Sequence, residues 1–131
     1  MPFSYPMEVR FRDLDALGHV NNAVMLTYLE QARIRWWEGF LRGRSFQECG
    51  FLIARIEVDY RKPILLQDAI RVELRCPQVG TSSFTLGFKV LREKDGVVMA
   101  EGQTVQVMMD FEHQRPQAIP ADAVAWLKAQ A

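Results

Sequence analysis

The stretch Asn22–Leu41, NAVMLTYLEQARIRWWEGFL, decides the fold of this chain. It contains no proline, and its apolar pattern predicts one long helix. Val24, Tyr28 and Trp37 broaden the apolar stripe, so the helix must be covered by other elements on most of its sides. The residues that recur at steps of three and four are Met25, Leu29, Ala32, Trp36 and Phe40.

Downstream of this helix the apolar residues alternate with polar ones. The alternation over 56–60, 70–76 and 84–90 predicts three strands, each with one charged face. The EKDG turn at Glu93–Gly96 joins the third strand to a long run over 97–109. These last two strands are therefore predicted to form a hairpin.

Two flanking segments complete the predicted order. Met7–Arg12 alternates loosely, with Val9 and Phe11 on the apolar side, and predicts a first strand. The tail over 120–130 is rich in alanine and opens with Pro120, which predicts a short terminal helix. The order is then a strand, the long helix, four consecutive strands and a short helix.

This order defines an α+β fold in a single domain, because the 131 residues match the usual size of one domain. We expect one antiparallel meander sheet wrapped around the long central helix, since only the inner face of a sheet can cover such a helix. The sheet would leave an edge and part of the helix uncovered. Pairing of two chains edge to edge would remedy this, so we expect a homodimer or homotetramer.

The composition excludes several classes of protein. Sixteen basic residues balance sixteen acidic ones, which argues against a nucleic-acid binder. Cys49 and Cys76 lack zinc or disulfide spacing, and reduced buried thiols are expected. No run approaches the ~20 apolar residues of a membrane span, and the start of the chain lacks a secretion signal, so we expect a cytoplasmic protein without membrane contact.

The residues with the most chemistry lie in RDLDALGHVNN, Arg12–Asn22, between the first strand and the helix. Asp15 could act as a nucleophile or a base, and the free amides at the helix start could hold an oxyanion. Asn21 or Asn22 could cap the helix. A structural interpretation stays open, because an Asp before a helix is most often a cap or turn residue, and His19 could equally belong to a turn.

The sequence lacks the residues that metal-dependent, serine-nucleophile and nucleotide-binding enzymes need. With only His19 and His113, a three-histidine metal site is impossible, and no metal is expected. No serine stands in a GxSxG setting, and neither a P-loop nor a GxGxxG motif is present, so no cofactor is expected.

Two stretches, VRFRDLDALGHVNNAVMLTYLEQAR (Val9–Arg33) and EVDYRKPILLQDAIRVELR (Glu57–Arg75), resemble the 4-hydroxybenzoyl-CoA thioesterase-like branch of hotdog-fold acyl-CoA thioesterases. Members of this family carry a strand, the motif D-x-D-x-x-G-H-V-N-N and then the central helix. The resemblance covers about residues 7–110, and it implies a single hotdog domain over 1–131. It also implies hydrolysis of acyl-CoA thioesters to free acid and CoA.

The resemblance also implies site residues. The family's essential carboxylate maps onto Asp15, which would attack the thioester or activate a water. Asn22 stands where relatives often have Tyr or His, and its backbone amide is the implied oxyanion donor. His19 and Asn21 belong to the HVNN variant of the motif and would have positioning roles.

Substrate contacts follow from the same resemblance. The acyl chain is expected between sheet and helix, beside Tyr28, Phe51 and Tyr60, and Ser82 and Ser83 could bind a phosphate or pantetheine. A turn before a strand needs no such role, however, and alternating Arg and Glu usually form a solvated sheet face. The candidates for the CoA phosphates are Arg55, Arg61, Lys62, Arg71, Arg75 and Lys89.

Two alternatives remain open. Hydratases and dehydratases of the same fold use an Asp and a His a few residues apart, as Asp15 and His19 are, although their His lies in a longer loop than HVNN. A non-catalytic acyl-CoA-binding module would keep the pocket without turnover, and the intact Asp15 argues against it.

Overall fold

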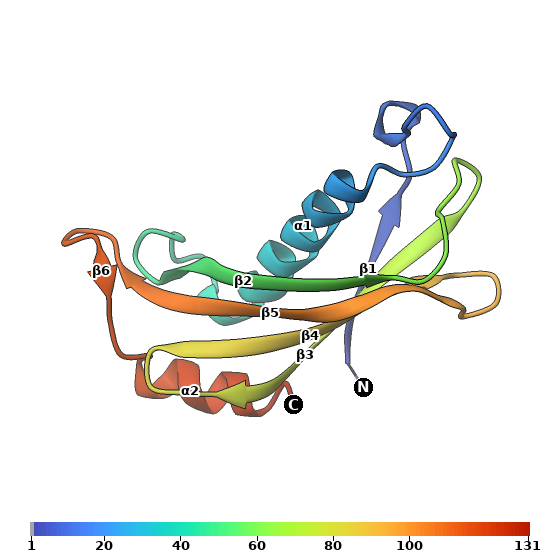
Figure 1. The fold of residues 1–131 in the computed structure, drawn as a ribbon. Coiled ribbons are helices and arrows are strands. Elements are labelled where there is room, and N and C mark those ends of the chain that lie inside the picture. The colour runs from blue at the N-terminus through green and yellow to red at the C-terminus, as the bar shows by residue number, and fades with distance from the viewer. Residues whose placement is uncertain (1) are drawn as a thin grey trace.

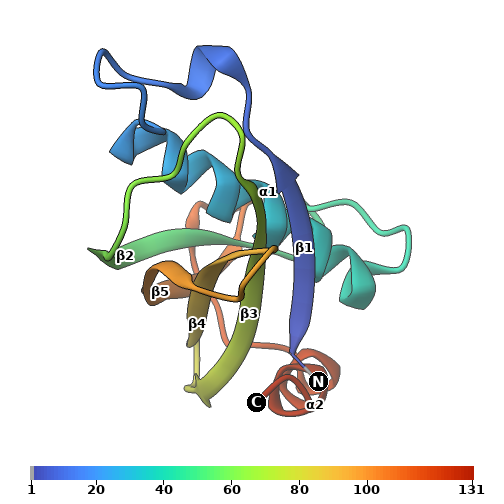
Figure 2. The ribbon, with the colours of Figure 1, turned by 90° about the vertical axis from the view of Figure 1, so that its right-hand side faces the viewer.

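A computed structural model describes residues 2–131. One antiparallel sheet curves around α1 (Asn22–Leu41), and α2 (Ala121–Lys128) packs against one end of the sheet (Figures 1 and 2). This arrangement confirms the predicted α+β fold class and both predicted helices. The strands are β1 (Phe3–Glu8), β2 (Gly50–Tyr60), β3 (Ala69–Val79), β4 (Ser83–Arg92), β5 (Val98–Asp110) and β6 (Arg115–Pro116).

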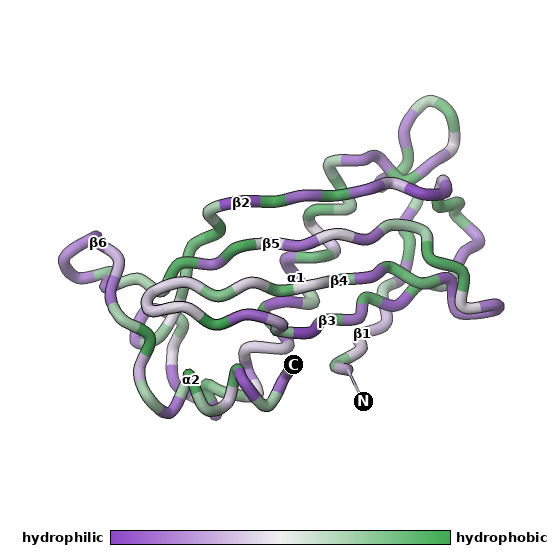
Figure 3. The backbone as a smooth tube through the Cα atoms, turned by 60° about the horizontal axis from the view of Figure 1, so that its bottom comes forward, coloured by the Kyte–Doolittle hydropathy of each residue, from purple (hydrophilic) through white to green (hydrophobic). Residues whose placement is uncertain are grey.

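The strands lie in the order β1-β3-β4-β5-β2, with the short β6 beside β5 (Figure 3). β3, β4 and β5 follow one another as a meander, and the EKDG turn joins the last two, as predicted. β2 departs from the prediction: it pairs with β5 at the far edge rather than with β3. Both sides of β3 are already occupied, by β1 and β4, so β2 cannot be its neighbour.

The long helix has the predicted bounds. The side chain of Asn21 caps it by accepting a hydrogen bond from the Ala23 amide at 2.7 Å. It ends after Leu41, where Arg42 takes a left-handed conformation with φ of 49°. One side of the helix packs under the sheet, whereas the opposite side is open to solvent and includes Ile34. One chain therefore covers the helix only in part.

The first strand is shifted from its predicted position at Met7–Arg12. β1 ends at Glu8, and residues Phe11–Asp13 form a single turn of 3₁₀ helix. The Asp13 carboxylate stabilises this turn by accepting a hydrogen bond from the Arg10 amide at 2.9 Å. As a result Phe11 is 80% exposed rather than buried, while Val9 is buried as predicted.

Aromatic residues fill the core at the α2 end of the sheet. Trp37 contacts Phe51, Phe84 and Trp126, and its indole N–H donates to the Cys49 carbonyl at 2.9 Å. Both cysteines are free and buried, as predicted. In the described part of the chain, neither helix is long and apolar enough to cross a membrane.

Candidate active site

The predicted site lies in a tight loop that leads from the 3₁₀ helix into α1. The Asp15 amide donates to the His19 carbonyl at 2.7 Å, and Leu14 forms a β-bridge with Val20. Gly18 turns the chain with φ of 80°, a conformation that glycine adopts without strain. The loop is therefore a small hairpin with a defined shape.

The hairpin fixes the carboxylate of Asp15. Its Oδ1 accepts hydrogen bonds from the amides of Leu17, at 2.9 Å, and His19, at 3.2 Å. Within residues 2–131, no donor is bonded to Oδ2, and the side chain is exposed. One oxygen thus holds the group in place while the other is available for chemistry.

The start of α1 presents a free amide beside this carboxylate. The Ala23 amide is capped by the Asn21 side chain, and the amides of Val24 and Met25 donate to the Asn21 carbonyl at 2.9 and 3.2 Å. The Asn22 amide has no acceptor among the described residues. It lies at the positive end of the helix dipole, where it can polarise a carbonyl oxygen.

Asp15 and Asn22 line one pocket of about 240 Å³. Tyr60, at the end of β2, closes one side of it by donating from its hydroxyl to the Asn22 carbonyl at 2.8 Å. The pocket therefore unites six of the residues that we predicted for the site with four that we did not. Its lining residues are Asp15, His19, Val20, Asn22, Met25, Tyr60, Arg61, Lys62, Pro63 and Ile64.

Sequence reasoning missed the apolar wall of this pocket. The Val20 amide donates to the Ile64 carbonyl at 2.8 Å, and His19 forms a β-bridge with Leu65. These contacts join the hairpin to the segment that follows β2. Because these contacts link two loops that are far apart in the sequence, no local pattern of residues predicts them. The nearest signal was the YRKPI stretch within the resemblance at Tyr60–Ile64.

Several predicted residues lie away from the pocket. Phe51 packs in the aromatic core, and the Tyr28 hydroxyl donates to Asp13 at 2.5 Å in a different hollow. Ser82 and Ser83 are at the opposite end of the sheet: Ser83 lies level with Leu52 of β2, since both pair with Val107, whereas the pocket begins at Tyr60. The structure does not bring these four to Asp15 within one chain.

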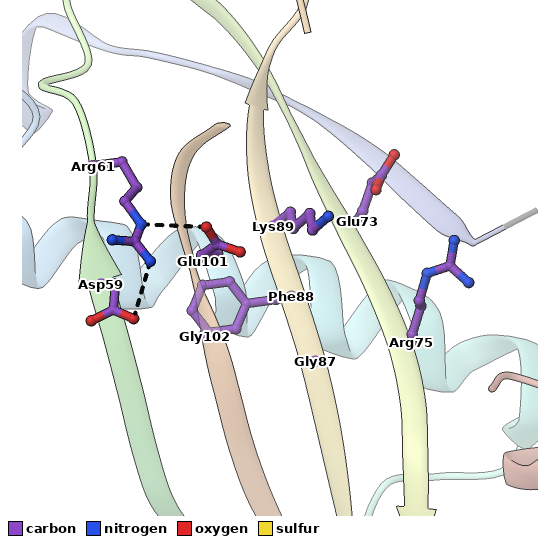
Figure 4. A pocket seen from close by; sticks show the side chains of 9 residues that line it. All are labelled: Asp59, Arg61, Glu73, Arg75, Gly87, Phe88, Lys89, Glu101 and Gly102. Atoms are coloured by element: carbon purple, nitrogen blue, oxygen red, sulfur yellow. Dashed lines mark hydrogen bonds and ion pairs between the residues drawn. The ribbon is translucent and has the colours of Figure 1, made fainter. Parts of the chain in front are cut away.

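The predicted basic residues divide into three groups. Arg61 and Lys62 line the Asp15 pocket. Arg55 and Arg71 form ion pairs with neighbouring glutamates. Arg75 and Lys89 line a second hollow of about 300 Å³ on the outer face of the sheet, which Arg61 also reaches (Figure 4).

The outer hollow is balanced in charge. Arg61 donates to Glu101 at 3.3 Å and lies 3.6 Å from Asp59 (Figure 4). Lys89 of β4 stands opposite Glu73 of β3 and Glu101 of β5 in the strand register. Cross-strand pairs of this kind match the interpretation of a solvated sheet face. Of the six basic candidates, only Arg61 and Lys62 line the Asp15 pocket, and the Arg61 guanidinium is also engaged by Asp59 and Glu101.

Comparison with known proteins identifies the family. Residues 9–127 match the thioesterase-like superfamily, and the chain belongs to it. The structure superposes with a TM-score of 0.91 on a predicted thioesterase from Bacillus stearothermophilus that is 27% identical, over 100% of this chain and 97% of the other. The protein is thus a hotdog-fold thioester hydrolase, as the resemblance implied.

Two further relatives carry more specific names. The long-chain acyl-CoA thioesterase FadM of Escherichia coli is 31% identical over 88% of this chain and 89% of its own length. A Thermus thermophilus thioesterase, solved in complex with coenzyme A and Zn, is 39% identical with a TM-score of 0.81, over 97% of this chain and 92% of that one.

Proposed function

We propose that the protein hydrolyses acyl-CoA thioesters, with Asp15 as the reacting carboxylate and the Asn22 amide as the oxyanion donor. The observation that carries this proposal is that one pocket is lined both by Asp15, whose Oδ2 is free, and by Asn22, whose amide is free. The names of FadM and of the coenzyme A complex support the acyl-CoA substrate.

The reaction would begin with the thioester carbonyl oxygen facing the Asn22 amide. Asp15 then either attacks the carbonyl carbon itself, to form an anhydride that water opens, or takes a proton from a water that attacks. In both cases the C–S bond breaks, CoA leaves as a thiolate that is then protonated, and the acid is released. An oxyanion donor typically contributes ~10² to 10³ in rate.

The pocket walls suggest how the substrate would lie. Met25 and Ile64 are buried apolar residues at the pocket, and Tyr60 flanks them, so we assign the acyl group to this side. Arg61 and Lys62 would meet the CoA phosphates, because they are the cations of the pocket. Asn21 and His19 would keep the positioning roles that the resemblance implies.

We also propose that two chains pair through β2. This strand is one of the two edges of the sheet, β1 being the other, and its helix-facing side chains Ile56 and Tyr60 are 41% and 44% exposed. A second copy of the chain would cover these side chains and would hydrogen-bond to the unpaired backbone groups of the edge strand. We expect a homodimer or homotetramer in the cytoplasm, where the two free thiols would stay reduced.

The test is release of CoA from a panel of acyl-CoAs, from acetyl to palmitoyl with benzoyl and phenylacetyl, by the wild type and by Asp15→Asn. We expect release by the wild type and at least a ~100-fold loss in the variant. Equal release by both proteins would mean that another carboxylate reacts. No release from any substrate would refute the thioesterase proposal for this panel.

A further inference from the structure

Asp13 and Tyr28 form a hydrogen bond beside the Asp15 pocket. The Tyr28 hydroxyl donates to Asp13 Oδ2 at 2.5 Å, and Tyr28 is only 4% exposed. The two side chains line a hollow between β1 and α1, and this hollow has no lining residue in common with the Asp15 pocket. The pair therefore does not line the Asp15 pocket itself.

Asp13 joins three pieces of the chain. Its Oδ2 also accepts from the Arg10 amide at 2.9 Å, which stabilises the 3₁₀ helix. Its backbone carbonyl accepts from the Asn21 amide at 2.9 Å, which closes the loop at the helix cap. Tyr28 is the link that attaches this junction to the body of α1.

The two proposed reacting groups lie close in sequence to Asp13 and Asn21, which are joined by a backbone hydrogen bond. Asp15 follows Asp13 by two residues, and Asn22 follows Asn21 directly. A shift of Asp13 relative to α1 would therefore change the distance between the Asp15 carboxylate and the Asn22 amide. Without the Tyr28 hydroxyl, the Asp13 side chain would keep only the Arg10 amide, from its own segment.

Tyr28 is suited to a permanent role as donor. Burial raises the pKa of its hydroxyl, and the Asp13 carboxylate raises it further, so the proton stays on the oxygen at neutral pH. A hydrogen bond from a hydroxyl to a carboxylate is among the stronger ones in proteins.

We propose that Asp13 and Tyr28 are positioning residues for thioester hydrolysis, and that their hydrogen bond keeps the Asp15 carboxylate at a fixed distance from the Asn22 amide. This inference rests on the proposed function. It predicts an effect on kcat rather than on substrate binding, since a small misplacement of reacting groups can cost ~10²-fold in rate.

The decisive variant is Tyr28→Phe, which keeps the buried ring and removes the hydroxyl. We expect kcat to fall about 10- to 100-fold while KM stays within about twofold. We also expect faster hydrogen exchange of the Leu17 and His19 amides, which bind Asp15 Oδ1. Asp13→Asn combined with Tyr28→Phe should be little worse than the more damaging single change, because both weaken the hydrogen bond between these two residues.

Leu127→Ala is the control for a general loss of stability. Leu127 is fully buried in α2, which lies at the other end of the sheet from the loop (Figure 1). It should lower stability through a cavity yet leave kcat within about twofold. An equal fall in kcat in both variants, or an unchanged kcat in Tyr28→Phe, would overturn the inference.

Hydrogen exchange separates this inference from the proposed function. If the wild type hydrolyses no acyl-CoA, the proposed function fails, but exchange at Leu17 and His19 still measures the order of the loop. Unchanged exchange in Tyr28→Phe would then overturn the positioning role by itself.

Discussion

The Tyr60 hydroxyl donates a hydrogen bond of 2.8 Å to the backbone carbonyl of Asn22, 38 residues earlier in the chain. This contact ties the end of the edge strand β2 to the first residue of α1. It places the wall of the pocket beside the amide that we propose as oxyanion donor. Tyr60 therefore links the sheet to the proposed chemistry.

Replacing Tyr60 by Phe should loosen this link. We expect a loss of about 0.5 to 1.5 kcal/mol in the free energy of unfolding, typical of one hydrogen bond, and a fall in kcat/KM of about tenfold. Urea unfolding and CoA release would measure the two effects. Tyr5→Phe removes a hydroxyl outside the Asp15 pocket and is the matched control. A kcat/KM equal to that of the wild type would contradict the role.

Gly18→Ala should damage the loop that carries Asp15. A Cβ at Gly18 meets no atom within 4 Å, so the cost is conformational, about 1 to 2 kcal/mol at φ of 80°. We expect lower stability together with lower activity. Gly43→Ala carries the same kind of strain at φ of 91°, just beyond the C-terminal end of α1 and away from the loop, and it should lower stability alone. Equal activity losses in the two variants would argue against a special role for the loop.

His19→Ala distinguishes hydrolysis from hydration. The variant keeps the backbone amide that bonds to Asp15, so we expect thioester hydrolysis to fall less than about tenfold. A hydratase that used the imidazole as acid or base would lose ~10² to 10⁴ in rate. Assays with a saturated acyl-CoA and an enoyl-CoA, side by side, measure both reactions. Loss of an enoyl-CoA hydration activity in the variant would favour the hydratase alternative.

The turn between β4 and β5 should lose stability in acid as Asp95 becomes protonated. Hydrogen bonds from the Arg92 guanidinium lower the pKa of Asp95 to about 2. A native pKa below that of the unfolded chain, about 3.9, stabilises the fold above pH 4, and this contribution is lost as the pH falls toward 2. The Tm advantage of the wild type over Asp95→Asn at pH 6 should thus disappear near pH 2. An undiminished difference there would contradict this linkage.

Local sequence determined a large part of this protein. The spacing of apolar residues and the absence of proline were enough to predict the bounds of α1. The EKDG turn was enough to predict the β4–β5 hairpin. The candidate site residues Asp15, Asn21 and Asn22 could be proposed from the sequence because they are neighbours in the chain. Their geometry arises from a turn and a helix cap, which form between residues a few positions apart.

Only the tertiary structure decided which distant segments meet. Alternation shows that a strand has a buried face but not which strand lies beside it, so the pairing of β2 with β5 was not predictable. The same holds for the contacts of Tyr60 with Asn22 and of Tyr28 with Asp13. The hydrogen-bond partners of such side chains depend on how the whole domain packs, because a buried hydroxyl bonds to whichever acceptor the fold brings within reach.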